Sequence, residues 1–172
     1  MAKALGDSVV VEAPKVEQKP LQHTIGIRSW IPSKTIGPSI TKFLDQTKAK
    51  LLAAGIADFG QPFFRFHCIN MGTEFEIEVG YLTASALPPI AGLVTNSFPA
   101  ARYTTLKYAG KNRGYQGNKA LIEWTRANGY EMDRWDTERG DTFACRFEIY
   151  ISDIDKVPDH KDWIKEIAIK LK

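Results

Sequence analysis

Alternation of apolar and polar residues predicts three strands in the first half of the chain. In the stretch HTIGIRSWI, over 23–31, isoleucine residues occupy three of the positions that share one side, at 25, 27 and 31. That period of two is typical of a half-buried strand. The segments 62–70 (PFFRFHCIN) and 74–83 (EFEIEVGYLT) are joined by the short turn Met71-Gly72-Thr73. They predict a β-hairpin.

A helical repeat lies between the first strand and this hairpin. Its apolar residues fall at offsets of 0, 3, 4 and 11, which is one stripe of a helix: Ile40, Phe43, Leu44 and Leu51. Pro38 suits the first turn of such a helix, and Gly55 suits its left-handed end. We therefore expect a helix over about 37–55.

The same order of elements returns in the second half of the chain. A strand is predicted over 101–110, a helix over 115–129, and two further strands over 143–152 and 163–171. Between the two halves, residues 86–100 contain three prolines and are interpreted as a connector.

These elements predict an α+β fold built from two β-α-β-β units, over 21–85 and 101–172. The units are expected to form one antiparallel sheet with two helices on one face and a ligand cleft on the other. Residues 1–20 contain no aromatic residue, show no sustained periodicity and carry balanced charges. They are interpreted as a flexible N-terminal tail in front of a single domain over 21–172.

Composition limits the classes of protein. The 172 residues, 44% of them hydrophobic, are enough for one domain with its own core, and the net charge of +3 is small. No apolar run approaches the roughly 20 residues of a membrane span, and the N-terminus lacks a signal-peptide core. A cytoplasmic location is therefore expected. Cys68 and Cys145 lack CxxC spacing and are expected to be buried free thiols.

Alternation also assigns side chains to the sheet face opposite the helices. This set combines carboxylates, aromatic rings and basic groups: Arg28, Trp30, Arg65, His67, Glu76, Glu78, Glu148, Tyr150 and Glu166. Glu166 has apolar neighbours in its strand, and a carboxylate in dry surroundings needs a cationic partner. Tyr150 and Trp30 offer ring faces to a cation or a flat aromatic molecule. The alternative for each residue is a solvated charge or a packing side chain.

Other kinds of site find little support. The histidines, His23, His67 and His160, show no metal-ligand spacing, so neither a metal nor a cofactor is expected. The stretch GKNRGYQG lacks the Lys-Ser/Thr ending of a phosphate-binding loop, and no GxSxG nucleophile motif occurs. Five basic residues lie between Arg102 and Lys119, but five acidic residues follow over 131–141. Direct nucleic-acid binding is therefore not expected.

The second half resembles the GyrI-like small-molecule-binding domain, which is also the effector-binding domain of many AraC-type and MerR-type multidrug regulators. The motifs that carry this resemblance occur in the family's order: Gly110, Gly114-Tyr115, Glu148, Tyr150, Asp153, Pro158, Asp159, Trp163 and Lys165-Glu166-Ile167. The stretches IRSWIPSKTIGPSI and FEIEVGY fit the first half of the family pattern, so the resemblance covers about 21–172. Lys165 stands where threonine is usual, and Arg113-Gly114-Tyr115 stands where Gly-Pro-Tyr is common.

The resemblance implies a duplicated unit around a pseudo-twofold cleft, lined by aromatic residues and containing a buried glutamate that attracts lipophilic cations. The ligand-binding residues expected on this basis are Glu166, Tyr150, Trp30, Tyr115, Glu78 and His67. Because no helix-turn-helix pattern flanks the domain, a stand-alone binder of aromatic, often cationic compounds is the leading expectation.

Two alternative functions follow from other members of the family. Some stand-alone members are hydrolases that open cyclopropane rings of DNA-alkylating natural products. In such an enzyme Glu166 would be the general base, and Tyr150 would hold or protonate the departing oxygen. Other members are interaction proteins that modulate DNA gyrase, for which the basic run around Lys111 and Arg113 would be the contact surface. The sequence does not indicate an oligomeric state.

Overall fold

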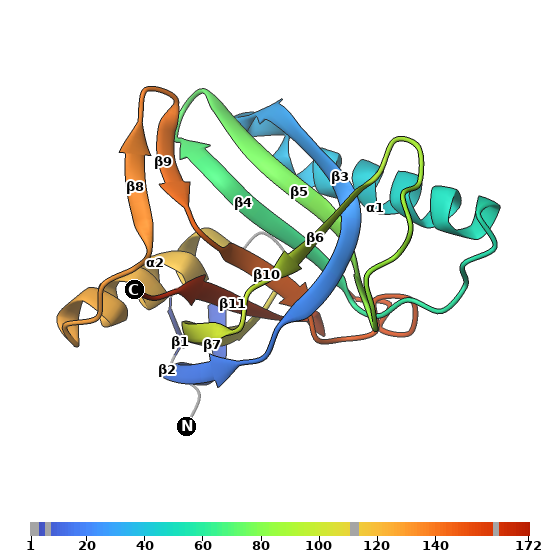
Figure 1. Ribbon diagram of the computed structural model, residues 1–172. Coiled ribbons are helices and arrows are strands. Elements are labelled where there is room, and N and C mark those ends of the chain that lie inside the picture. Colours follow the sequence, from blue (N-terminus) through green and yellow to red (C-terminus); the bar gives the residue numbers. More distant parts are fainter. Residues whose placement is uncertain (1–3, 6–7, 111–113, 160–161) are drawn as a thin grey trace.

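The computed structural model describes residues 4–5, 8–110, 114–159 and 162–172, which form a large antiparallel sheet with two helices (Figure 1). The strands are β1 (Ala4–Leu5), β2 (Ser8–Lys19), β3 (Gln22–Pro32), β4 (Pro62–Asn70), β5 (Glu74–Thr83), β6 (Val94–Phe98), β7 (Ala101–Ala109), β8 (Arg134–Thr137), β9 (Gly140–Phe143), β10 (Arg146–Tyr150) and β11 (Ile164–Lys170). The helices are α1 (Ile36–Ala53), which follows a 3-10 turn (Ser33–Thr35), and α2 (Gly114–Ala127). The expected α+β fold class is confirmed.

The strand order reveals two equivalent units that meet at the β4–β10 pair. Along the sheet the order is β1-β2-β7-β11-β10-β4-β5-β3-β6. The first unit is β3-α1-β4-β5 and the second is β7-α2-β10-β11, so equivalent strands lie at equivalent distances from the central pair. On the outside, β6 flanks the first unit as β2 flanks the second. The β8–β9 hairpin is inserted before β10 and joins the sheet through β4.

Helix α1 packs on the first unit through the apolar stripe that the sequence predicts. Leu44 and Leu51 are buried in a cluster that includes Phe64 and Ile77 of the sheet. The helix ends at Gly55, whose φ of 77° is the left-handed conformation that favours glycine. These contacts hold α1 mainly against β3 and β5.

Helix α2 lies close to the second unit because a glycine faces the sheet. A Cβ atom on Gly117 would lie 3.1 Å from the side chains of both Ile167 and Tyr108. Leu121, one helical turn further on, is fully buried in the same cluster. The close approach lets short polar side chains of α2 reach the strands beneath them.

Both helices cover the same face of the sheet. Phe64 belongs to the cluster under α1, and its cross-strand neighbour Glu148 accepts a hydrogen bond from Asn118 of α2. Directly paired residues share a face, so the helices do too. We call this side the helix face.

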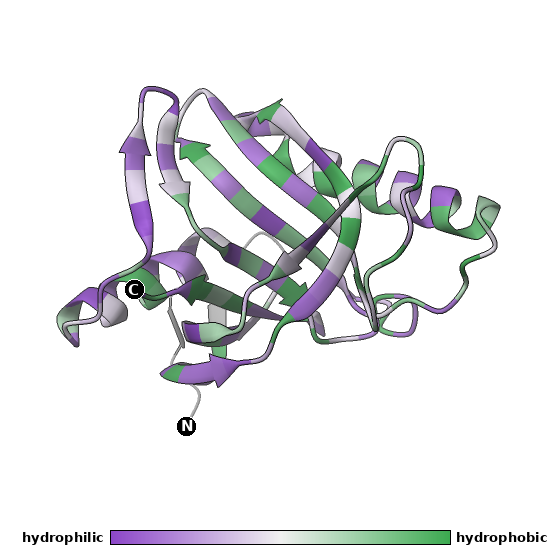
Figure 2. Ribbon diagram, viewed as in Figure 1, coloured by the Kyte–Doolittle hydropathy of each residue, from purple (hydrophilic) through white to green (hydrophobic). Residues whose placement is uncertain are grey.

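The opposite face carries an apolar cluster of its own. Phe98 and Phe147 stack there with centroids 3.8 Å apart, beside Phe63 and Tyr103. Only two residues separate β2 from β3, although these strands lie near opposite ends of the strand order. The sheet is therefore strongly curled, and β3 visibly bends across it in Figure 1. Green and purple segments alternate along β4 and β5 in Figure 2, as expected for strands covered on both sides.

The N-terminal segment differs from the flexible tail that the sequence suggests. Residues 8–19 form β2, which pairs with β7 and places Val10 in the core below α2. The pairing register shifts between Val10 and Glu12 and again between Glu12 and Lys15. Such irregularities break the period of two, so the strand leaves no clean alternation in the sequence.

Two further elements lie outside the sequence-based expectation. The connector over 86–100 contains β6, which pairs with β3, and the acidic stretch over 131–141 contributes most of the β8–β9 hairpin. Both are short, and the hairpin strands contain several charged residues.

The expectation for the thiols is confirmed, since Cys68 and Cys145 are free and buried. Within the described ranges, neither helix has the length and apolar character needed to cross a membrane.

Candidate ligand-binding site

A cleft of about 480 Å³ opens on the helix face of the first unit, between α1 and the segments next to β4 and β10. Its walls include side chains of α1, the segment just before β4, strand β5, the loop after β10 and the residue before β11. The residues that line it are Thr41, Leu44, Asp45, Lys48, Phe59, Gly60, Gln61, Pro62, Tyr81, Tyr150, Ile151, Ser152, Asp153, Ile154, Asp155 and Trp163. The cleft is therefore on the helix face and not on the opposite face, where alternation predicts it.

Aromatic rings line two sides of the cleft. Phe59 and Tyr81 lie with their ring centroids 4.7 Å apart, and Tyr150 and Trp163 form an edge-to-face pair at 5.8 Å. The indole Nε1 of Trp163 donates a 2.9 Å hydrogen bond to the carbonyl of Val157. These contacts fix the orientation of the rings, so they present a largely preformed apolar surface to a guest.

The rim of the cleft is acidic. Asp45, Asp153 and Asp155 line it together with one lysine, Lys48, which lies 3.7 Å from Asp155. Burial, together with the negative charges of Asp45 and Asp155, raises the pKa of Tyr81 to about 12. The same negative potential favours a positively charged guest next to the rings.

A second group of aromatic side chains lies beside the cleft and shares Tyr150 with it. Tyr150, Lys165 and Tyr108 are direct cross-strand neighbours on β10, β11 and β7. Phe64 adds a fourth side chain, with its ring centroid 6.0 Å from that of Tyr150. Lys165 Nζ lies over the rings of Phe64, Tyr108 and Tyr150. We call these three rings the aromatic cage.

Glu148 is the buried carboxylate of this region, with 2% of its surface exposed. Tyr108 donates a 2.5 Å hydrogen bond to Oε1, and Asn118 of α2 donates a 3.1 Å hydrogen bond to Oε2. Arg146 in turn donates to the amide oxygen of Asn118 at 2.8 Å. Burial, followed by the charge of Glu148, raises the pKa of Tyr108 well above its usual value. Tyr108 therefore stays a neutral donor to the carboxylate.

Glu166 lies on the other face of the sheet and does not line the cleft. Its carboxylate is 2.5 Å from Lys19 of β2 and 4.0 Å from Lys107 of β7. Lys107 also pairs with Glu12 at 2.8 Å. Glu166 therefore has the cationic partner that a carboxylate among apolar neighbours needs. That partner is Lys19 of the same chain and not a bound ligand.

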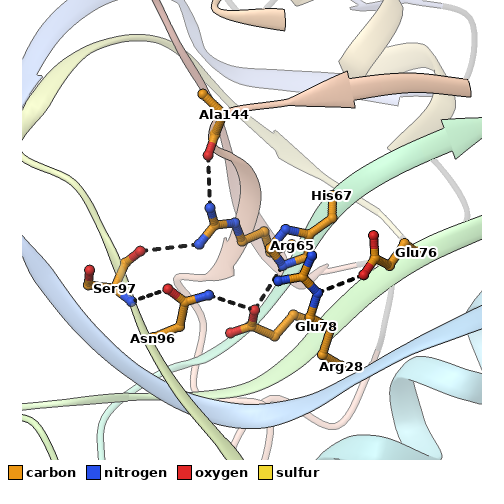
Figure 3. Close-up of polar contacts among 8 residues, drawn as sticks. All are labelled: Arg28, Arg65, His67, Glu76, Glu78, Asn96, Ser97 and Ala144. Atoms are coloured by element: carbon orange, nitrogen blue, oxygen red, sulfur yellow. Dashed lines mark hydrogen bonds and ion pairs between the residues drawn. The ribbon is translucent and has the colours of Figure 1, made fainter. Parts of the chain in front are cut away.

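Glu78 and His67 form a separate buried network on the face opposite the helices (Figure 3). His67 Nε2 lies 2.8 Å from Glu78, and Asn96 donates to the same carboxylate oxygen at 3.0 Å. Arg65 donates to the carbonyls of Ser97 and Ala144. These bonds join β4, β5, β6 and the segment before β10. Their role in the fold is to connect strands inside the curled sheet.

Trp30 and Tyr115 lie elsewhere on the surface. The guanidinium of Arg139, in the β8–β9 turn, lies 3.4 Å from the centroid of the Trp30 ring. Tyr115, in the first turn of α2, is 70% exposed. Of the six residues expected to bind ligand, Tyr150 alone appears among the residues that line the cleft.

The face assignment from alternation is correct for most strands and wrong for β10. Arg28, Arg65, Glu78 and Glu166 point away from the helices, as expected, but Glu148 and Tyr150 are on the helix face. The assignment of Glu148 and Tyr150 to the opposite face depends on apolar side chains facing the helices. Phe147 and Ile149 instead belong to the apolar cluster on the opposite face.

Several residues of the cleft and cage carry no distinctive signal in the sequence. Phe59 lies in a loop, Asp45 is one acidic residue of an amphipathic helix, and Tyr81 is one apolar residue of a strand. The one signal for Lys165 in the sequence is that it stands where GyrI-like domains usually have threonine. Among the described residues, no group of three or more His, Cys, Asp or Glu side chains is arranged to hold a metal ion. Lys111 and Arg113, proposed as a contact surface, lie outside the described residues.

No protein-family model and no curated protein matches the sequence. Solved structures nevertheless share its fold. The C-terminal domain of EcmrR superposes with a TM-score of 0.75 at 15% identity, over 94% of this chain and 98% of that domain. In the EcmrR–DNA complex the TM-score is 0.76 at 15% identity, and the match spans 58% of the EcmrR chain, less than two thirds of it.

Two other structures are similar at lower scores. SAV2435 bound to tetraphenylphosphonium has a TM-score of 0.57 at 12% identity, over 92% of this chain and 93% of that one. A hydrolase from Listeria innocua has a TM-score of 0.57 at 10% identity, over 94% of this chain and 92% of that one. These similarities define the class of fold, which is the GyrI-like fold expected from the sequence.

Proposed function

We propose that this protein binds a lipophilic, aromatic, cationic small molecule in the cleft between α1 and the loop after β10. The observation that carries the proposal is the combination of four aromatic rings and three aspartates around a cavity of about 480 Å³. A cavity of roughly 300–1,000 Å³ is typical of small-molecule sites. The rings supply apolar contact and the carboxylates supply charge complementarity.

The comparison with SAV2435 supports a guest of this chemistry. That protein, which shares the fold, is bound to tetraphenylphosphonium, a cation whose charge is shielded by four aromatic rings. In this chain the rings of Phe59, Tyr81, Tyr150 and Trp163 and the carboxylate of Asp45 would meet such a guest.

The test is calorimetric titration with tetraphenylphosphonium and with triphenylphosphine oxide as a neutral analogue. Replacing Asp45 with Asn should weaken binding of the cation by about fivefold or more and change binding of the neutral analogue by less than about twofold. Glu123→Gln is the matched control, because Glu123 is an exposed glutamate of α2 that does not line the cleft. It should leave both affinities unchanged.

Two results would contradict the proposal. One is that the wild-type protein does not bind tetraphenylphosphonium at millimolar concentration. The other is that folded Trp163→Leu and Tyr81→Leu variants, which lack rings of the cleft, keep the wild-type affinity for the cation.

The cyclopropane hydrolase suggested by other members of the family is not supported with Glu166 and Tyr150 as its catalytic pair. Glu166 pairs with Lys19 on one face of the sheet, while Tyr150 lines the cleft on the other. One bound substrate cannot touch both side chains. Binding of a cation is therefore the function that the geometry favours.

A further inference from the structure

Lys165 places its ammonium group inside the aromatic cage. The Nζ atom lies 5.1 Å from the ring centroid of Tyr150 and 5.7 Å from those of Tyr108 and Phe64. These distances are within the roughly 6 Å over which a ring face attracts a cation. The cage can therefore stabilise a cation, and in this structure that cation is the chain's own lysine.

The ammonium of Lys165 interacts with these three rings. Within the described ranges, no hydrogen bond or ion pair joins Lys165 Nζ to another group. The side chain is partly exposed. Burial lowers the pKa of Lys165, and the charge of Glu148 only partly offsets that effect. The ammonium can therefore turn toward solvent without breaking a hydrogen bond, and it regains hydration when it does.

The cage is next to the proposed cleft. Tyr150 both lines the cleft and belongs to the cage, and Trp163 packs on it with ring centroids 5.8 Å apart. A guest that fills the cleft and extends past Tyr150 places its positive charge where Lys165 already has one. Guest and lysine therefore compete for the same rings and for the field of Glu148.

We propose that Lys165 is a specificity-determining residue, a tethered competitor that keeps small hydrated alkylammonium ions out of the aromatic cage and gives way to lipophilic cations. The proposal rests on the proposed function and deepens it, because it defines which cations the site accepts.

The discrimination follows from tethering and hydration. A free alkylammonium ion has the same chemistry as the lysine side chain, but it must compete with a group held at an effective concentration in the millimolar range. A lipophilic cation such as tetraphenylphosphonium has a shielded charge and loses little hydration when it enters the cage. The displaced ammonium recovers its own hydration, so the exchange favours the lipophilic guest.

The experiment compares the wild-type protein with Lys165→Met and Lys165→Ala. Methionine keeps much of the length of lysine without its charge, and alanine also empties the cage. Both variants should bind tetraphenylphosphonium about tenfold more tightly than the wild-type protein in calorimetric titrations. The affinity for triphenylphosphine oxide should change by less than about threefold in Lys165→Met, because the neutral analogue does not compete with a charge.

n-Butylammonium, which reproduces the lysine side chain, provides the second readout. At millimolar concentration it should weaken binding of tetraphenylphosphonium to Lys165→Ala by about fivefold and have less than a twofold effect on the wild-type protein. Circular dichroism establishes that the variants are folded. If Lys165→Ala does not fold, the affinity of Lys165→Met decides the test.

The outcomes separate this inference from the proposed function. If the wild-type protein binds tetraphenylphosphonium and both variants bind it equally or more weakly, the role of Lys165 is overturned while the function stands. If neither the wild-type protein nor either variant binds the cation, both are overturned.

Discussion

Tyr108 and Glu148 are joined by a 2.5 Å hydrogen bond between two side chains that are almost entirely withdrawn from solvent. Tyr108 comes from β7 and Glu148 from β10, so the bond spans the intervening strand β11. Asn118 of α2 satisfies the second carboxylate oxygen. The pair thereby connects helix α2 to the centre of the sheet, next to the aromatic cage.

Removing the hydroxyl of Tyr108 should destabilise the fold. In Tyr108→Phe, one oxygen of a buried carboxylate loses its donor, which costs about 1–3 kcal/mol. Urea denaturation followed by circular dichroism measures the change. Tyr115→Phe is the control, because Tyr115 is 70% exposed and should tolerate the same change within about 0.5 kcal/mol. Equal effects in the two variants would show that the buried bond contributes no specific stability.

Two adjacent valines test whether β2 is part of the folded domain. Val10 is 8% exposed and packs below α2, whereas Val11 is 46% exposed. Val10→Asp buries a carboxylate without a partner and should cost about 2–4 kcal/mol, while Val11→Asp should cost less than about 1 kcal/mol. Thermal unfolding distinguishes them. A flexible tail would tolerate both substitutions equally.

The charge of Glu166 should matter little for the cleft. Because this carboxylate is paired with Lys19 on the opposite face, Glu166→Gln should change the affinity for tetraphenylphosphonium by less than about twofold. Calorimetric titration beside Asp45→Asn provides the comparison. A loss of about tenfold in Glu166→Gln would instead support the assignment of Glu166 as the ligand-binding glutamate.

The His67–Glu78 pair should make stability depend on pH in the acid range. Burial alone raises the pKa of Glu78, but hydrogen bonds from His67 and Asn96 outweigh it and hold the pKa below its usual 4.5. A glutamate with a lowered pKa in the folded state stabilises the protein above the unfolded-state value. That contribution is lost as the pH falls through the folded-state pKa.

The unfolding free energy of the wild-type protein should therefore fall more steeply below about pH 4.5 than that of Glu78→Gln. Urea titrations from neutral to acidic pH measure both slopes. Parallel curves would mean that the network contributes nothing to acid sensitivity.

Binding of tetraphenylphosphonium should strengthen as the pH rises through the lowered pKa of Lys165. Glu148 on β10 and Tyr108 on β7 face this lysine together with Tyr150, and the raised pKa values of both tyrosines keep them neutral. Deprotonation of Lys165 therefore removes the competing charge, while the charge of the quaternary guest does not change. Lys165→Met should lack this pH dependence in calorimetric titrations. An identical profile in the two proteins would assign it to another group.

The regular elements could be predicted from the sequence because their side-chain periods are clean. The helix over 36–53 and the hairpin over 62–83 follow the predicted ranges closely. The β2 strand could not be recognised, since its bulges shift the period. Strand β6 has no apolar alternation, since Val94 and Thr95 are exposed and Phe98 is its one buried residue.

The site was harder to predict because the sequence does not show which face of the curled sheet each side chain occupies. Phe147 and Glu148 alternate as expected, but both faces of the sheet bury apolar side chains, so alternation could not say which of the two residues meets the helices. The partner of Glu166 comes from Lys19, in a segment interpreted as a tail. The cleft itself is built largely from loop residues, such as Phe59 and Asp155, whose position depends on the closed fold.

The pairing of β2 with β7 has a consequence for how the chain folds during synthesis. Strand β2 leaves the ribosome before any part of the first unit, yet its partner β7 begins at residue 101. The edge of β2 that pairs with β7 therefore lacks its partner while the whole first unit is made and folds. The second unit is completed only when β7 pairs with this earlier-synthesised strand, a contact of high sequence separation that should make its assembly slow.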